Sequence, residues 1–276
     1  MELCSARRSP EGTRYWRRGS GTPLVLIHGV GLDATMWQAQ LEALPEQFDI
    51  IAYDMLGHGE SPRPSEHAGL EEYALQLSRL LDHLGIDRAC VLGFSMGGLV
   101  ARAFALQHPE RLAALIILSS VFGRNEEQKS GVQARVRQTY EHGPSANIDE
   151  ALKRWFSPAY QQAHPEMIAA IHKTMRHNDP LGYYRSYALF ASEDMYGAER
   201  LANLSAPTLI ATGELDQGST PAMAHRLAEQ LPNAEVHIFE GQRHMVPVEA
   251  PPLVNGVVRR FLSNVSFHPS LEETSS

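Results

Sequence analysis

The sequence predicts an α/β fold in which helices cover both faces of a mostly parallel sheet and an inserted helical cap lies over one end of that sheet. Two observations lead to this fold class. Short apolar runs alternate with helical patterns over most of the 276 residues, and such alternation is typical of a parallel sheet with helices on both faces. Between residues 121 and 200 the alternation stops, and helical patterns follow one another without a strong strand.

Six short runs rich in Val, Ile and Leu are predicted to form the strands. Near-continuous apolar runs of this length are typical of parallel strands that are buried on both faces. The runs cover residues 24–28, 48–54, 90–93, 115–118, 208–211 and 236–239.

The segments between these runs carry the helical patterns. After residue 54, apolar side chains keep the i, i+3, i+4, i+7 spacing of an amphipathic helix; they are Leu70, Tyr73, Leu77, Leu80, Leu81 and Leu84. Further core helices are predicted over 96–107, 221–230 and 251–262.

Residues 122–200 are predicted to form the cap. Helical patterns span 148–155 and 165–177, and ten of the 21 aromatic residues fall in this third of the chain. A helical insertion over one end of the sheet explains both facts. The predicted organisation is therefore a first core segment (1–121), the cap (122–200), a second core segment (201–264) and a flexible tail (265–276).

Composition and charge exclude several other classes of protein. The net charge of −8 argues against nucleic acid or an anionic membrane surface as a partner. No apolar run approaches the roughly 20 residues of a membrane-spanning helix. The two cysteines, Cys4 and Cys90, are too few for a disulfide framework. We expect a cytoplasmic protein with a small-molecule substrate and without a metal, and a homodimer is left open.

A G-x-S-x-G pattern predicts the nucleophile. The run Gly93–Gly98 directly follows a predicted strand and opens a predicted helix. A sharp strand-to-helix turn forces the serine into a strained backbone conformation, and glycine on either side removes clashes with a Cβ atom. The hydroxyl of Ser95 then projects above the edge of the sheet, where it can attack a carbonyl.

A serine hydroxyl is a weak nucleophile, so it needs a base that is oriented by a carboxylate. Among 13 histidines, position selects His244, which falls between the last strand and the last helix at the same sheet edge as Ser95. Asp216 follows the strand at 208–211 and is the predicted acid, with Glu214 as the alternative.

Other polar residues near strand ends or in the cap are expected to be structural. His28 and His58 are interpreted as loop-shaping residues, and Asp54 is expected to hold the loop around His58. His172 and His177 are assigned to a solvated face of the cap.

The oxyanion of an acyl-transfer intermediate needs preorganised N–H donors, each worth about 10²–10³ in rate. The backbone N–H of Met96 is one candidate, because it follows the nucleophile at the start of a helix. The loop after the first long strand supplies the other, which we assign to Val30. This loop contains neither GxxxxGK[ST] nor GxGxxG, so it is not predicted to bind a phosphate.

From about Tyr15 to Leu262 the sequence resembles the α/β-hydrolase superfamily. The nucleophile, acid and base also follow one another in the order of that superfamily. The resemblance implies a Ser95–His244–Asp216 triad, an oxyanion hole formed by Val30 and Met96, and no cofactor. The blocks that carry it are His28-Gly29, Asp54-x-x-Gly57-His58-Gly59-x-Ser61, Gly93–Gly98, Gly213-x-x-Asp216 and His244.

Within the superfamily, the cap segments 154–160 and 178–183 resemble those of 3-oxoadipate enol-lactonases and their esterase relatives. This resemblance implies that Trp155 faces the substrate. Long charged side chains are more often solvated than bound to a ligand, but four cap cations are candidates for meeting a substrate carboxylate: Arg154, Lys173, Arg176 and Arg185.

The predicted function is a serine hydrolase that cleaves a carboxylic ester or lactone through an acyl-enzyme. One alternative is a carbon–carbon bond hydrolase of aromatic catabolism, although such enzymes usually carry HGxGPG and GNSMGG motifs where this chain has His28-Gly-Val-Gly-Leu32 and Gly93-Phe-Ser95. A second is a ligand-binding protein on the same fold. A perhydrolase side activity would use the same triad.

Overall fold

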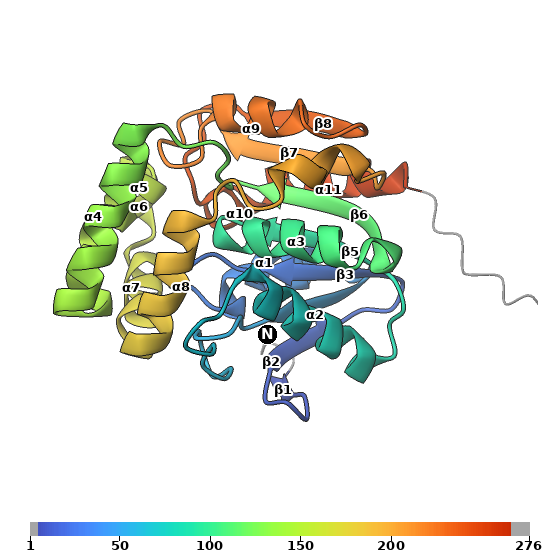
Figure 1. Cartoon of the computed structure of the whole chain (residues 1–276), viewed down its shortest axis with the longest axis horizontal. Coiled ribbons are helices and arrows are strands. Elements are labelled where there is room, and N and C mark those ends of the chain that lie inside the picture. The colour runs from blue at the N-terminus through green and yellow to red at the C-terminus, as the bar shows by residue number, and fades with distance from the viewer. Residues whose placement is uncertain (1–4, 266–276) are drawn as a thin grey trace, which may run out of the picture.

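The computed structural model describes residues 5–265 and shows one eight-stranded sheet between layers of helices (Figure 1). The strands are ordered β1-β2-β4-β3-β5-β6-β7-β8, and the six strands from β3 to β8 pair in parallel. All six predicted runs coincide with strands, although His28 and Asp54 at the ends of the first two runs lie one residue beyond β3 and β4. The bounds are β1 Arg7–Arg8, β2 Arg14–Arg18, β3 Thr22–Ile27, β4 Phe48–Tyr53, β5 Ala89–Phe94, β6 Leu112–Leu118, β7 Thr208–Gly213 and β8 Ala234–Phe239.

The sequence analysis does not predict β1 and β2, which extend the sheet in antiparallel pairing beyond β4. Arginines hide the apolar pattern of β2, although Tyr15 and Trp16 are buried there. Arg17 forms an ion pair with Asp49 of β4 at 2.6 Å. Arg14 lies over the Trp16 ring at 4.6 Å. Asp49 and the Trp16 ring therefore compensate the charges of these two arginines. In the sequence alone the same arginines indicate a polar surface segment rather than a strand.

The core helices lie on both faces of the sheet, as predicted. Buried side chains of α2, α3 and α9 belong to one apolar cluster, and those of α1, α10 and α11 belong to a second cluster on the opposite face. Their bounds are α1 Gln38–Ala43, α2 Leu70–Leu84, α3 Met96–Gln107, α9 Pro221–Ala228, α10 Val246–Glu249 and α11 Pro251–Ser263, with short 3₁₀ turns at Ala34–Trp37 and Pro109–Arg111.

Between β6 and β7, in the region where the sequence predicts the cap, helices stack at one end of the sheet, at the left of Figure 1. The first of these helices begins at a capping box, in which Asn125 and Gln128 exchange side-chain and backbone hydrogen bonds. The bounds are α4 Glu126–His142, α5 Ile148–Trp155, α6 Pro158–Ala163, α7 Pro165–Arg176 and α8 Pro180–Ser192, with 3₁₀ turns at Pro144–Asn147 and Ala198–Asn203.

The structure also bears on the predictions about the cysteines, the C-terminal tail, membrane-spanning helices and metal-binding groups. Cys90 is a free, buried thiol in β5, and burial raises its pKa. Cys4 and residues 266–276 of the predicted tail lie outside the described residues. Within residues 5–265, no helix is long and apolar enough to cross a membrane. The same part of the chain contains no group of His, Cys, Asp and Glu residues that could hold a metal ion.

Candidate active site

Ser95 occupies a strained turn between β5 and α3, with φ of 54° and ψ of −116°. Tight packing on both sides explains the two glycines of the motif. A Cβ atom on Gly93 would lie 2.1 Å from the carbonyl oxygen of Gly97, and one on Gly97 would lie 2.4 Å from that of Ile27. The strained turn is therefore held between neighbouring backbone segments, which raises the serine above the end of the sheet.

The loops after β7 and β8 bring Asp216 and His244 together. Nδ1 of His244 lies 2.6 Å from Oδ2 of Asp216, and both side chains are buried. The second carboxylate oxygen, Oδ1, accepts hydrogen bonds from the backbone N–H groups of Gly218 and Ser219, each at 2.9 Å. Asp216 is thus fixed on one side by its own loop and orients the imidazole with the other side.

The alternative acid, Glu214, does not contact His244. It is exposed, and its side chain accepts a hydrogen bond from the backbone N–H of Gly241 instead. Of the two carboxylates that the sequence left open, the structure brings Asp216 to the histidine.

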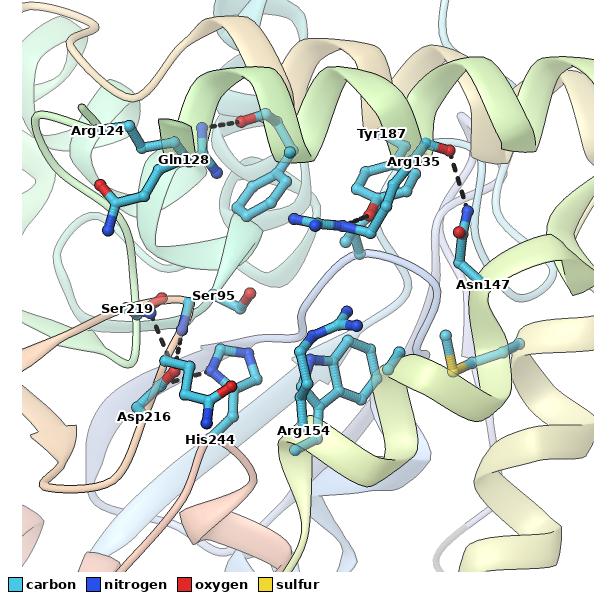
Figure 2. A pocket seen from close by; sticks show the side chains of 18 of the residues that line it. Ser95, Arg124, Gln128, Arg135, Asn147, Arg154, Tyr187, Asp216, Ser219 and His244 are labelled. Atoms are coloured by element: carbon cyan, nitrogen blue, oxygen red, sulfur yellow. Dashed lines mark hydrogen bonds and ion pairs between the residues drawn. The ribbon is translucent and has the colours of Figure 1, made fainter. Parts of the chain in front are cut away.

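Ser95, Asp216 and His244 line one cavity of about 450 Å³, which lies between the cap helices and the end of the sheet (Figure 2). A cavity of this size can hold a small organic substrate. The carboxyl ends of the parallel strands meet at this edge, which explains why residues from three distant loops converge there.

The two predicted oxyanion donors are Val30, which lies in the cavity that Ser95 also lines, and Met96, the residue after Ser95 in the chain. Val30 follows β3, and Met96 begins α3. Within the described residues, neither backbone N–H donates a hydrogen bond to another protein group. The oxyanion-hole role of these two N–H groups therefore stays a prediction that their unpaired state permits.

Trp155 lines the same cavity and packs on His244. Its ring lies 5.6 Å from the imidazole at an interplanar angle of 32°, and Phe94 lies 4.9 Å from the imidazole. The backbone of the cap also holds this region, because the N–H of Met245 donates to the carbonyl oxygen of Trp155.

Three arginines line the cavity, and only one of the four predicted cap cations is among them. Arg154 is the predicted residue that reaches the cavity, whereas Lys173, Arg176 and Arg185 do not line it. The sequence analysis missed Arg124 and Arg135. The second could have been found from helical spacing, because Gln128, Gly131 and Arg135 share one face of α4, and all three line the cavity.

The three arginines differ in their partners. Arg124 is buried against Asp194 at 3.9 Å and donates to the carbonyl oxygen of Phe190. Arg135 donates from Nε to the hydroxyl of Tyr187. Arg154 forms no hydrogen bond or ion pair with a described residue, and burial together with the positive charge of Arg135 lowers its pKa.

The remaining polar predictions fall in the loops beneath the cavity. His28 Nε2 accepts a hydrogen bond from the N–H of Met55, and burial lowers the pKa of His28 to about 4. Asp54 accepts hydrogen bonds from the N–H groups of Ala34 and Glu60, and burial raises its pKa to about 7. These residues hold loops, as the sequence predicts.

His58 and the two cap histidines also lie away from the reacting groups. The buried His58 ring contacts the edge of His28. His172 lies 3.5 Å from Asp149, and His177 contacts the carbonyl oxygen of Lys173; neither histidine lines the cavity.

Comparison with known proteins identifies the family. The sequence profile described as the alpha/beta hydrolase fold matches residues 22–251. The chain belongs to the α/β-hydrolase family. Its relatives include (E)-2-((N-methylformamido)methylene)succinate hydrolase of Acinetobacter baylyi, which is 30% identical over 90% of this chain and 93% of the relative. 3-Oxoadipate enol-lactonase 2 of the same organism is 28% identical over 86% of this chain and 89% of the lactonase.

Solved structures of this family agree with the fold. An esterase from Thermogutta terrifontis with bound malate matches with a TM-score of 0.82 and 31% identity, over 94% of this α/β hydrolase and 96% of the esterase. The enol-lactonase of Burkholderia xenovorans matches with a TM-score of 0.82 and 27% identity, over 91% of this chain and 97% of the enol-lactonase. The predicted fold class and the resemblance to enol-lactonase-like esterases are confirmed.

Proposed function

We propose that this α/β hydrolase cleaves a carboxylic ester or lactone with Ser95 as the nucleophile. The observation that carries the proposal is the 2.6 Å contact between His244 and Asp216 in the cavity that Ser95 also lines. The strained backbone of Ser95 is a second support, because a serine adopts such a conformation only where the surroundings enforce it.

The reaction follows from the position of each group. His244 Nε2 takes the proton as Ser95 Oγ attacks the acyl carbon, while the Nδ1–H of His244 donates to Asp216. The carbonyl oxygen becomes an oxyanion that the N–H groups of Val30 and Met96 stabilise. Collapse expels the alcohol or enol oxygen, which receives the proton from His244. Water, deprotonated by His244, then attacks the acyl carbon of the acyl-enzyme. The bond from the acyl carbon to Ser95 Oγ breaks, Oγ takes the proton back from His244, and the acid is released.

We further propose that the substrate carries a carboxylate, as an enol-lactone of a dicarboxylic acid does. Figure 2 shows Arg135 and Arg154 extending into the same part of the cavity. Glu127 also lines the cavity, but it forms no ion pair with either arginine in the described part of the chain. Two half-buried cations that form no ion pair with a described acidic residue favour an anionic ligand. Relatives named for a succinate derivative and for 3-oxoadipate support this substrate class.

The test compares wild type and Ser95→Ala on nitrophenyl esters and on lactones that include a carboxylated enol-lactone. We expect turnover of the enol-lactone to exceed that of neutral esters and to fall by several orders of magnitude in Ser95→Ala. Preference for neutral esters would reject the carboxylated substrate and indicate a general esterase. Substantial turnover by folded Ser95→Ala contradicts the proposal.

The alternatives give different results in the same experiment. A carbon–carbon bond hydrolase would be silent on the panel but would require Ser95 for its own substrates. A ligand-binding protein would be stabilised against heat by a carboxylated ligand without turnover.

A further inference from the structure

The loop after β3, residues 28–32, is held by a side chain from the cap. Nδ2 of Asn178 donates a hydrogen bond of 2.8 Å to the carbonyl oxygen of Gly31. Asn178 lies between α7 and α8, 147 residues away along the chain, and is 7% exposed. The contact therefore joins the cap to the loop that carries Val30.

This hydrogen bond is the first in a series of contacts that ends at the N–H of Val30, the proposed oxyanion donor. The carbonyl of Gly31 and the N–H of Leu32 belong to one planar peptide unit. The N–H of Leu32 donates to the carbonyl oxygen of Gly29 at 3.2 Å. The carbonyl of Gly29 shares its own peptide plane with the N–H of Val30. Two rigid planes thus connect Asn178 to the N–H of Val30, the proposed oxyanion donor.

His28 holds the second plane from the other side. Its Nε2 accepts the N–H of Met55 at 2.9 Å, so the proton of the neutral ring lies on Nδ1. Nδ1 is 2.8 Å from the carbonyl oxygen of Gly29 and donates to it. The carbonyl of Gly29 therefore receives two hydrogen bonds, which fix the direction of the Val30 N–H and increase its polarisation.

The side-chain amide of Asn178 can donate to the carbonyl of Gly31 in only one of its two orientations. Nδ2 also lies 3.1 Å from the carbonyl oxygen of Met175 and 3.4 Å from that of Thr174. Three carbonyl oxygens around one atom require a donor there. A carboxylate or an apolar side chain at position 178 would leave the carbonyl of Gly31 without this partner.

We propose that Asn178 is a positioning residue, which orients the Val30 N–H for the oxyanion through the peptide planes of residues 29–32. This inference rests on the proposed serine mechanism. Asn178 does not line the cavity, so its effect is expected on kcat rather than on KM. Because an oxyanion donor is worth about 10²–10³ in rate, partial loss of its orientation lowers kcat about 10–100-fold.

A second contact between cap and core supplies a matched control. Arg63 forms an ion pair with Asp179, the neighbour of Asn178, at 2.5 Å. This pair is on the surface and makes no hydrogen bond to residues 28–32 among the described contacts. Arg63→Gln therefore weakens docking of the same cap segment without removing a partner of the loop.

The experiment measures kcat, KM and thermal stability for wild type, Asn178→Ala, Asn178→Asp, Arg63→Gln and Ser95→Ala. It also measures inhibition by phenylboronic acid, whose adduct with a serine places an anionic oxygen in an oxyanion hole. We expect kcat and boronate affinity to fall together in Asn178→Ala and further in Asn178→Asp, whose carboxylate repels the carbonyl of Gly31. KM is expected to change less than about threefold, and Arg63→Gln to resemble wild type.

Two results overturn the inference. The first is a folded Asn178→Ala with the kcat and boronate affinity of wild type. The second is a parallel fall of kcat and thermal stability in both Asn178→Ala and Arg63→Gln, which would show that Asn178 only docks the cap. Turnover that persists in Ser95→Ala would instead reject the proposed function, so the two failures are distinguishable.

Discussion

The ring of Trp155 lies against the imidazole of His244, with 5.6 Å between ring centroids, so the cap covers the proposed base directly. Phe94 packs on the same imidazole at 4.9 Å. The two aromatic rings and the hydrogen bond to Asp216 together restrict rotation of the His244 imidazole.

Replacing Trp155 by Ala is expected to lower kcat about tenfold, because the imidazole gains water and freedom of rotation. Trp155→Phe retains an aromatic face and is expected to recover most of the loss. Tyr160→Ala, a cap aromatic outside the cavity lining, is the control. Steady-state kinetics on a neutral ester measure the effect. A change in KM alone would mean that Trp155 contacts substrate without positioning the base.

Replacing Arg135 or Arg154 by Gln is expected to raise KM for a carboxylated enol-lactone about 10–100-fold. This range corresponds to the loss of a charged hydrogen bond, about 1.5–3 kcal/mol. Neutral nitrophenyl esters should keep their KM. The control is Arg176→Gln, which changes an exposed cap arginine outside the cavity lining. Equal effects on charged and neutral substrates would exclude carboxylate recognition.

Gly93→Ala is expected to lower the free energy of unfolding by about 3 kcal/mol or more, because the new Cβ would lie 2.1 Å from the carbonyl oxygen of Gly97. Gly256 in α11 has no atom within 4 Å of an added Cβ. Gly256→Ala should therefore raise the free energy of unfolding by about 0.5–1 kcal/mol. Urea unfolding measures both changes, and similar values for the two variants would contradict the packing argument.

Acid should destabilise the protein through its buried histidines. Burial lowers the pKa of His28 to about 4 and that of His58 to about 3, from an ordinary value of 6.5. Below pH 6.5 these histidines bind protons in the unfolded chain but stay neutral in the folded chain. Their contribution therefore lowers the free energy of unfolding as the pH falls toward 4. Asp54 acts in the opposite direction, because burial raises its pKa to about 7 and the folded state holds its proton more tightly.

Asp54→Asn removes that opposing contribution. Between pH 7 and pH 4, the free energy of unfolding should therefore fall more steeply in this variant than in wild type, by up to about 1.4 kcal/mol per pH unit. Urea unfolding at several pH values gives the two slopes. Parallel slopes would show that Asp54 is ionised in the folded protein throughout this range.

Local sequence determined the parallel strands and the turn at Ser95. A parallel strand buried on both faces is apolar at almost every position, so its pattern is complete within a few residues. The strained turn is likewise a local signal, because the two glycines and the serine lie within five residues. The arginine-rich β2 was missed because its stabilising partners, such as Asp49, lie on another strand.

Tertiary structure decided which distant groups meet. The sequence proposed Asp216 and Glu214 for His244, and only the path of the loop after β7 placed Asp216 at the imidazole. In the same way, the packing of α4 against α8 brought Arg135 into the cavity and onto Tyr187.

The hydrogen bond from Asn178 to Gly31 spans 147 residues and leaves no periodic pattern in either segment. Strand and turn propensities act between neighbours, and they can be read from the order of residues. Contacts between the cap and the loops of the core depend on how helices pack, which residue order alone does not specify.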